Sequence, residues 1–171
     1  MSYFAAALTR RGDRWTGEEA DLSECESIAD LGDVLRDLPG EVRLLVIEQD
    51  DEYAALLRLD DTEDDPRAFL SDGHAADRYP MAAIVAEELA EIGGDALADN
   101  PVVAADPDLA ETAAAVHDSA PFGDADLVED LGTSAADLIE MCEHQGTLPV
   151  DLVLAVCEKA GCGAVFEDLR G

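Results

Sequence analysis

The sequence contains a single lysine, Lys159, and no lysine or arginine lies between Arg78 and that residue. Only 10 basic side chains stand against 41 acidic ones, which gives a net charge of -31. Because nucleic-acid affinity comes mainly from lysine and arginine side chains that neutralise phosphates, this composition disfavours direct nucleic-acid binding. It favours a basic partner surface through electrostatic steering. Solubility or adaptation to salt is the alternative explanation for the charge.

Long hydrophobic runs are also missing. The apolar stretch from Met1 to Leu8 is short, and Arg10 and Arg11 follow it instead of preceding it, which does not fit a signal peptide. No run approaches the roughly 20 apolar residues that a membrane helix requires. We therefore expect a soluble, cytoplasmic protein without a membrane partner. Its four cysteines should be reduced thiols.

Motifs for catalysis and cofactor binding are absent as well. The sequence has no G-x-S-x-G, P-loop or G-x-G-x-x-G pattern. The candidate metal ligands are Cys142, His144, Cys157 and Cys162, but residues two apart on a helix point to different faces, so the first two should not converge. No histidine begins the H-x-E pattern that zinc-dependent nucleic-acid deaminases need. We predict no catalytic residues, no cofactor and no metal, and hence a protein that is not an enzyme; an enzyme of unrecognised type is the alternative.

What the sequence does contain is a stretch, Val42 to Leu70, with the pattern of a β-sheet. The apolar runs 42–49 and 52–59 are separated by Asp50-Asp51, which predicts a β-hairpin. In the first run both alternating sets of side chains are apolar, which indicates a central strand covered on both sides. Further strands are predicted at 66–70, 3–9 and 15–22.

Two helices are expected beside this sheet. In the segment 27–38, apolar side chains recur at helical spacing and form one face. Ser27 can cap the N-terminus of this helix, with Asp30 in the capping-box position. The second helix spans residues 73–92, where Tyr79-Pro80 is expected to break the first turn.

The remainder of the chain predicts a linker and a small helical domain. Residues 93–123 are rich in alanine and acidic residues, contain prolines and lack basic residues, which is typical of a flexible linker. Residues 124–171 predict about four short helices, with Gly132 as a C-cap and Thr133 as an N-cap, docked on the sheet or on a partner. The predicted fold class is α+β: a small, mainly antiparallel sheet with two helices in residues 1–92, an acidic linker, and a C-terminal bundle of short helices.

Short motifs along most of the chain carry a family resemblance. They are Tyr3-Phe-Ala-Ala-Ala-Leu8, Leu45-Val-Ile-Glu-Gln-Asp50, Arg67-Ala-Phe-Leu-Ser-Asp72, Gly123-Asp-Ala-Asp-Leu127, Asp130-Leu-Gly-Thr-Ser134, Gly146-Thr-Leu-Pro-Val-Asp151 and Glu158-Lys-Ala-Gly-Cys162. With these motifs and its acidic middle, the chain resembles the tRNA adenosine deaminase-associated proteins of actinobacteria. None of the motifs is a catalytic signature, so the resemblance transfers no catalytic residue.

The resemblance implies an association with the enzyme that converts adenosine to inosine at the wobble position of tRNA. Together with the missing chemistry and the charge, it leads to the hypothesis of a non-catalytic acidic accessory protein. This protein would bind and modulate the tRNA adenosine deaminase or another basic protein. The alternative is a nucleic-acid mimic whose acidic face inhibits a basic protein. The residues predicted to contact the partner, which also fit structural roles in caps and turns, are Asp130, Leu131, Gly132, Thr133, Gly146, Thr147, Leu148, Pro149 and Leu152.

Overall fold

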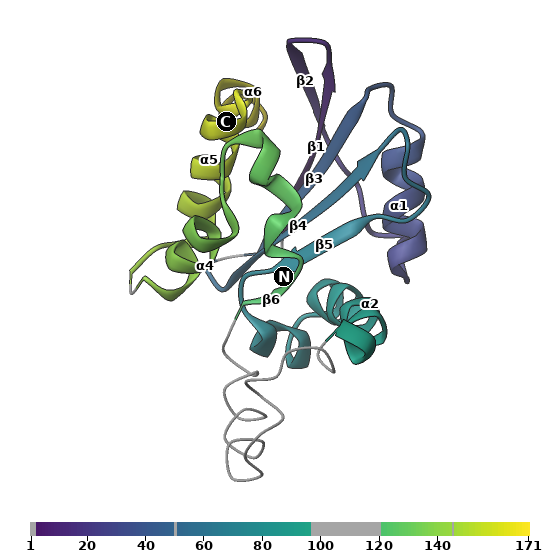
Figure 1. Cartoon of the computed structure of the whole chain (residues 1–171), viewed down its shortest axis with the longest axis vertical. Coiled ribbons are helices and arrows are strands. Elements are labelled where there is room, and N and C mark those ends of the chain that lie inside the picture. Colours follow the sequence, from purple (N-terminus) through teal and green to yellow (C-terminus); the bar gives the residue numbers. More distant parts are fainter. Residues whose placement is uncertain (1–2, 50, 97–120, 145) are drawn as a thin grey trace, which may run out of the picture.

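The centre of the fold is a six-stranded sheet, described by a computed structural model for residues 3–49, 51–96, 121–144 and 146–171 (Figure 1). The strand order is β2-β1-β3-β4-β5-β6, and all neighbouring strands are antiparallel. The predicted fold class is therefore confirmed. The strands are β1 (Tyr3–Arg11), β2 (Arg14–Glu19), β3 (Val42–Gln49), β4 (Tyr53–Asp60), β5 (Arg67–Leu70) and β6 (Phe122–Gly123).

The predicted hairpin is present as β3 and β4. Strand β4 begins at Tyr53, which pairs with Gln49, so the prediction that it begins at Glu52 is wrong. The backbone N–H of Glu52 donates instead to the carbonyl of Gln49 at 3.1 Å, which closes the turn. The turn therefore places the carboxylates of Asp51 and Glu52 at the exposed tip of the hairpin.

Helices cover both faces of this sheet. The predicted helix 73–92 is divided between two helices on either side of Tyr79, as the following proline indicated, and its second part continues past residue 92. The helices are α1 (Ile28–Arg36), the 3₁₀ helix η1 (Gly73–Asp77), α2 (Pro80–Ala96), the 3₁₀ helix η3 (Ala125–Leu131), α4 (Ala135–Glu143), α5 (Pro149–Ala160) and α6 (Gly163–Arg170).

The predicted linker 93–123 includes regular structure at both ends. Helix α2 takes up its first residues, and Phe122–Gly123 form β6 against β5. Strand β6 was not predicted, because two residues are too few to show a periodic pattern. Gly123 has a φ of 114°, and a Cβ atom there would lie 2.5 Å from the carbonyl oxygen of Ala68, so this pairing requires glycine. The rest of the predicted linker, residues 97–120, lies outside the described residues.

Two of the three predicted helix caps are present in the structure. The capping box of α1 is confirmed: the Ser27 hydroxyl accepts the N–H of Asp30 at 3.3 Å, and the Asp30 carboxylate accepts the N–H of Ser27 at 3.0 Å. Gly132 ends η3 with a φ of 109°, as predicted. Thr133 is not the N-cap of α4, however. Ser134 caps that helix, and Thr133 is buried.

Each face of the sheet has its own hydrophobic core. On β3, Leu45 and Ile47 pack with α1 and α2, whereas Leu44 and Val46 pack with the C-terminal helices. This alternation confirms the prediction of a strand covered on both sides. The C-terminal helices thus dock on the sheet, which was one of the two outcomes expected for them.

Polar contacts fasten α5 and α6 to the sheet in addition to the apolar core. The indole N–H of Trp15 on β2 donates to the carbonyl oxygen of Ala160 at the end of α5, at 3.0 Å. Arg170 on α6 donates to both carboxylate oxygens of Glu48 on β3, at 2.6 and 3.1 Å. These contacts fix the last two helices against strands from the first half of the sequence. Within the described part of the chain, no helix combines the length and apolar character needed to cross a membrane.

Candidate functional site

The first group of predicted contact residues, 130–133, occupies structural positions at the end of η3. Leu131 and Thr133 are buried, and Gly132 forms the left-handed C-cap. Asp130 is engaged by Arg58, which projects from β4. The positions of these residues therefore fit structural roles at a helix end and in the core. A contact between the exposed side of Asp130 and a partner stays a prediction.

Arg58 is a buried cation whose hydrogen-bonding capacity is fully used. Its side chain is 3% exposed. The Nε and Nη2 groups donate to Asp60 at 2.8 and 2.9 Å, Nη2 also donates to Asp130 at 2.9 Å, and Nη1 donates to Asp130 and to the carbonyl oxygen of Leu127 at 2.7 Å. Every guanidinium N–H thus has an acceptor. We call Arg58, Asp60 and Asp130 the Arg58 cluster.

Electrostatics in the Arg58 cluster favour the charged forms of Arg58 and Asp130. Burial of Arg58 opposes its charge, but the hydrogen bonds to Asp130 and Asp60 outweigh burial and raise the pKa of the guanidinium. The hydrogen bonds that Arg58 donates to Asp130 also lower the pKa of Asp130. The cluster therefore ties η3 to β4 as a permanent ion pair at neutral pH.

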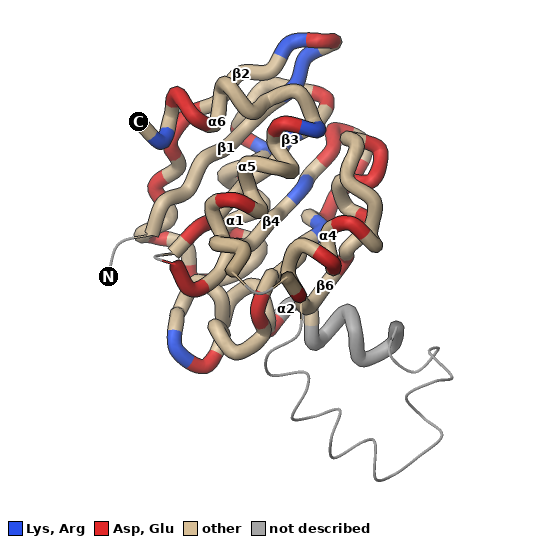
Figure 2. Tube along the Cα trace, turned by 90° about the vertical axis from the view of Figure 1, so that its left-hand side faces the viewer, with Lys and Arg blue, Asp and Glu red and all other residues tan. Residues whose placement is uncertain are grey.

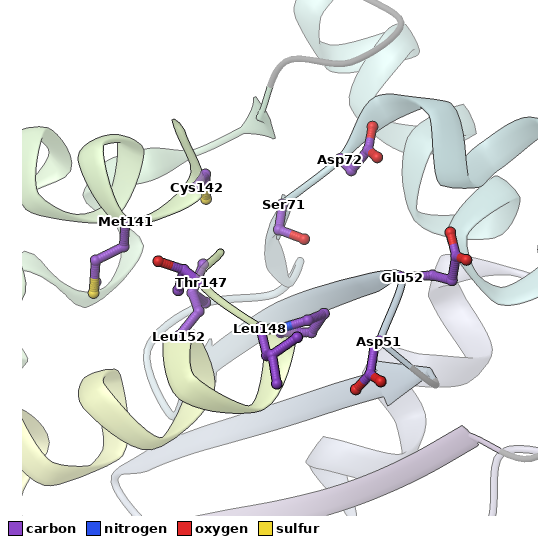
Figure 3. Close-up of a pocket in the computed structure, with 10 residues that line it drawn as sticks. Asp51, Glu52, Ser71, Asp72, Met141, Cys142, Thr147, Leu148 and Leu152 are labelled. Atoms are coloured by element: carbon purple, nitrogen blue, oxygen red, sulfur yellow. The ribbon is translucent and has the colours of Figure 1, made fainter. Parts of the chain in front are cut away.

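The second group of predicted contact residues surrounds a cavity of about 150 Å³. Thr147, Leu148, Pro149 and Leu152 line it, whereas Gly146 precedes them outside its wall. The structure thus brings most of this group together at one surface depression. The complete lining, which we call the Leu148 groove, is Asp51, Glu52, Ser71, Asp72, Met141, Cys142, Thr147, Leu148, Pro149 and Leu152 (Figure 3).

The Leu148 groove has an apolar wall and an acidic wall. Figure 3 shows Leu148, Leu152 and Met141 on one side and the carboxylates on the other. Sequence patterns gave no indication of the acidic wall, because Asp51 and Asp72 lie far from Leu148 in the chain. No lysine or arginine belongs to the lining of this groove.

One of the exposed apolar side chains belongs to the groove, and the other lies outside its lining. Leu148 is 42% exposed and Ile139 is 37% exposed, and these are the exposed large hydrophobic residues of the described chain. Both lie in the C-terminal helical segment. Leu152 is different, because it is 3% exposed and belongs to the core on that face of the sheet. Leu148 is therefore the member of the predicted set best placed to contact another molecule.

Cys142 and Cys157 are poor candidates for nucleophiles. Burial raises the pKa of Cys142, in the groove, to about 12, with a contribution from Glu143. Cys157 and Cys162 are both buried, and the hydrogen bond from the Cys157 thiol to Cys162 raises the pKa of Cys157. Reactive cysteines need an accessible thiolate. Among the residues that the structure describes, no group of three or more His, Cys, Asp and Glu side chains is placed to hold a metal ion.

Acidic residues are spread over helices and turns throughout the described molecule, and basic residues are few (Figure 2). Such a charge destabilises the compact state by self-repulsion. We expect the melting temperature to rise by about 5 °C or more between 0.1 and 1 M NaCl, as the screening length falls from about 10 to about 3 Å. Differential scanning calorimetry would measure this change. A melting temperature that rises and then levels off between 0.1 and 1 M NaCl would identify screening as the cause. A constant or falling melting temperature would contradict the prediction.

Comparison with known proteins shows that one family model matches the chain. The family model described as Rv3753c-like tRNA adenosine deaminase-associated protein matches residues 3–163. The match contains the whole sheet, the Arg58 cluster and the Leu148 groove, and it confirms the resemblance carried by the short motifs. No curated protein and no solved structure matches the chain.

Proposed function

The chain belongs to the Rv3753c-like tRNA adenosine deaminase-associated protein family, and from this premise we propose that it is a non-catalytic accessory protein that binds the deaminase and modulates or stabilises it. The family name states the association. Direct binding, the effect on the deaminase and the absence of catalysis are parts of the proposal.

The observation that carries the proposal is the combination of an acidic surface with the exposed apolar side chain of Leu148. An enzyme that acts on tRNA needs lysine and arginine on its substrate-binding surface. A protein with a net charge of -31 is steered towards such a surface over distances comparable to the screening length. Exposed Leu148 offers an apolar contact once the two proteins have met.

The state of the polar side chains supports a non-catalytic role. Cys142 is the thiol in the Leu148 groove, and its raised pKa keeps it protonated at neutral pH. In the Arg58 cluster, the guanidinium is saturated by acceptors of the protein itself. The groove therefore lacks an activated thiol, and the guanidinium of the Arg58 cluster has no N–H left for a substrate.

Isothermal titration of this protein with the cognate tRNA adenosine deaminase, at low and at moderate salt, tests the proposal. We expect a dissociation constant in the micromolar range or tighter at both salt concentrations, with a moderate weakening by salt. An unrelated protein of similar negative charge serves as a control for non-specific attraction. Sedimentation velocity of the mixture covers the case in which binding releases little heat.

Several outcomes would change the proposal. Absence of a complex in both measurements would overturn it. Binding no tighter than that of the acidic control would also overturn it, because charge alone would then explain the attraction. Binding that disappears at moderate salt and competes with tRNA would indicate the nucleic-acid mimic instead.

A further inference from the structure

We propose that the Leu148 groove is the docking site for a basic segment of the deaminase, in which an apolar side chain covers Leu148 and a neighbouring arginine or lysine reaches the acidic wall. This inference rests on the proposed function and adds to it the site and the chemistry of the partner segment. The two walls of the groove, one apolar and one acidic, are the basis for both halves of the predicted segment.

The groove is assembled from three distant parts of the chain. The tip of the β3–β4 hairpin supplies Asp51 and Glu52, the segment after β5 supplies Ser71 and Asp72, and the start of α5 supplies Leu148. Ser71 is held in place because its hydroxyl accepts the N–H of Ala54 at 2.9 Å and its own N–H donates to the carbonyl of Ala54 at 2.9 Å. The backbone next to Asp72 is therefore fixed to the sheet before any partner arrives.

The carboxylates of the acidic wall can accept a partner cation. Asp51 is exposed at the hairpin tip. Glu52 is 3.3 Å from Arg78, but both side chains are largely exposed, so a partner cation can share or replace that contact. Asp72 uses one oxygen to accept the N–H of His74 at 2.9 Å, and among the described residues no hydrogen bond reaches its other oxygen. A guanidinium binds such carboxylates with two parallel hydrogen bonds, which favours arginine.

The N-terminus of α5 borders the groove and would by itself repel a cation. Asp151 in the first turn offsets this effect, because its carboxylate accepts the N–H of Leu148 at 3.3 Å. The net local charge of the groove therefore remains negative. Leu148 is the N-cap residue and has an extended backbone, which turns its side chain away from the buried stripe of the helix.

Charge selects the occupant of the groove. A second copy of this chain would be repelled, because each copy has a net charge of -31. A nucleic acid would be repelled as well, because its phosphates would face the acidic wall. A basic protein segment meets neither penalty. Met141 adds an adaptable apolar surface at the groove edge. The groove also shares Met141 and Thr147 with a second cavity of about 260 Å³ along α4, where Lys159 is paired with Asp137. The two cavities together can hold a segment rather than one side chain.

Binding measurements with matched variants test this inference. Leu148→Asp should weaken binding of the cognate deaminase at least tenfold, because a carboxylate replaces the apolar contact. Its control is Ile139→Asp, the same change at the other exposed apolar residue, which lines neither cavity. The pair Asp51→Asn and Glu52→Gln should weaken binding several-fold at low salt and less at 0.5 M NaCl. Its control is Glu18→Gln with Glu19→Gln, two exposed carboxylates on the edge strand β2.

The outcomes separate the groove from the wider proposal. Tenfold or greater loss for Leu148→Asp, with both controls within threefold of the wild type, supports the groove. Wild-type binding that Leu148→Asp and Ile139→Asp reduce equally, or that neither reduces, overturns the groove and leaves the accessory function standing. Absence of wild-type binding overturns the accessory function and removes the premise of this inference. Circular dichroism of each variant confirms that the fold is retained.

Discussion

Replacing Arg58 with alanine is expected to lower the free energy of unfolding by about 3 kcal/mol. The substitution removes a buried side chain and leaves Asp60, Asp130 and the Leu127 carbonyl without their donor. Loss of one partner of a buried ion pair costs about 3–5 kcal/mol, and the partial exposure of the two carboxylates places this case at the lower end. Urea unfolding at pH 7, followed by the fluorescence of Trp15, would measure the change.

Arg67→Ala provides the matched control for that experiment. Arg67 projects from β5, and its nitrogens lie 3.6 Å from Asp124 and 3.7 Å from Glu63. Its side chain is about one third exposed, so water screens these longer contacts. We expect a loss below about 1 kcal/mol. Equal losses for the two variants would contradict the view that the Arg58 cluster fastens η3 to the sheet.

Local sequence patterns predicted much of the fold because they report neighbouring residues. The capping box at Ser27 and Asp30 lies within a single helical turn, and alternation along β3 reveals two buried faces within eight residues. The C-cap at Gly132 is equally local. Such features depend on backbone sterics and hydrogen bonds that a short window contains.

Non-local pairing explains what the sequence patterns missed. Arg58 and Asp130 form an ion pair across 72 positions of the chain, and no short window shows that relation. The assignment of Thr133 as an N-cap was wrong because Ser134 offers the same chemistry one residue later, and packing decides which of the two is buried. The acidic wall of the groove likewise depends on how the hairpin tip and α5 meet in space.

The start of α5 shows most directly how structure refines the prediction of contact residues. Helical spacing assigns Leu148 and Leu152 to the same face, since they are four residues apart. Leu148 is instead the N-cap residue, with φ of -79° and ψ of 153°, so it lies outside the helical stripe. One leucine therefore faces the groove opening, and the other lies in the core.

Leu152→Asp is consequently expected to lower the free energy of unfolding by more than about 4 kcal/mol, because it removes a buried leucine and places a carboxylate in the apolar core. Leu148→Asp should change it by less than about 1 kcal/mol, since its side chain already meets water. Urea unfolding reported by Trp15 suits both variants, because this single tryptophan bonds to the end of α5. Comparable destabilisation by both substitutions would refute the distinction. If the two differ as expected, a loss of partner binding in Leu148→Asp reports a lost contact, whereas the same loss in Leu152→Asp reports an unfolded protein.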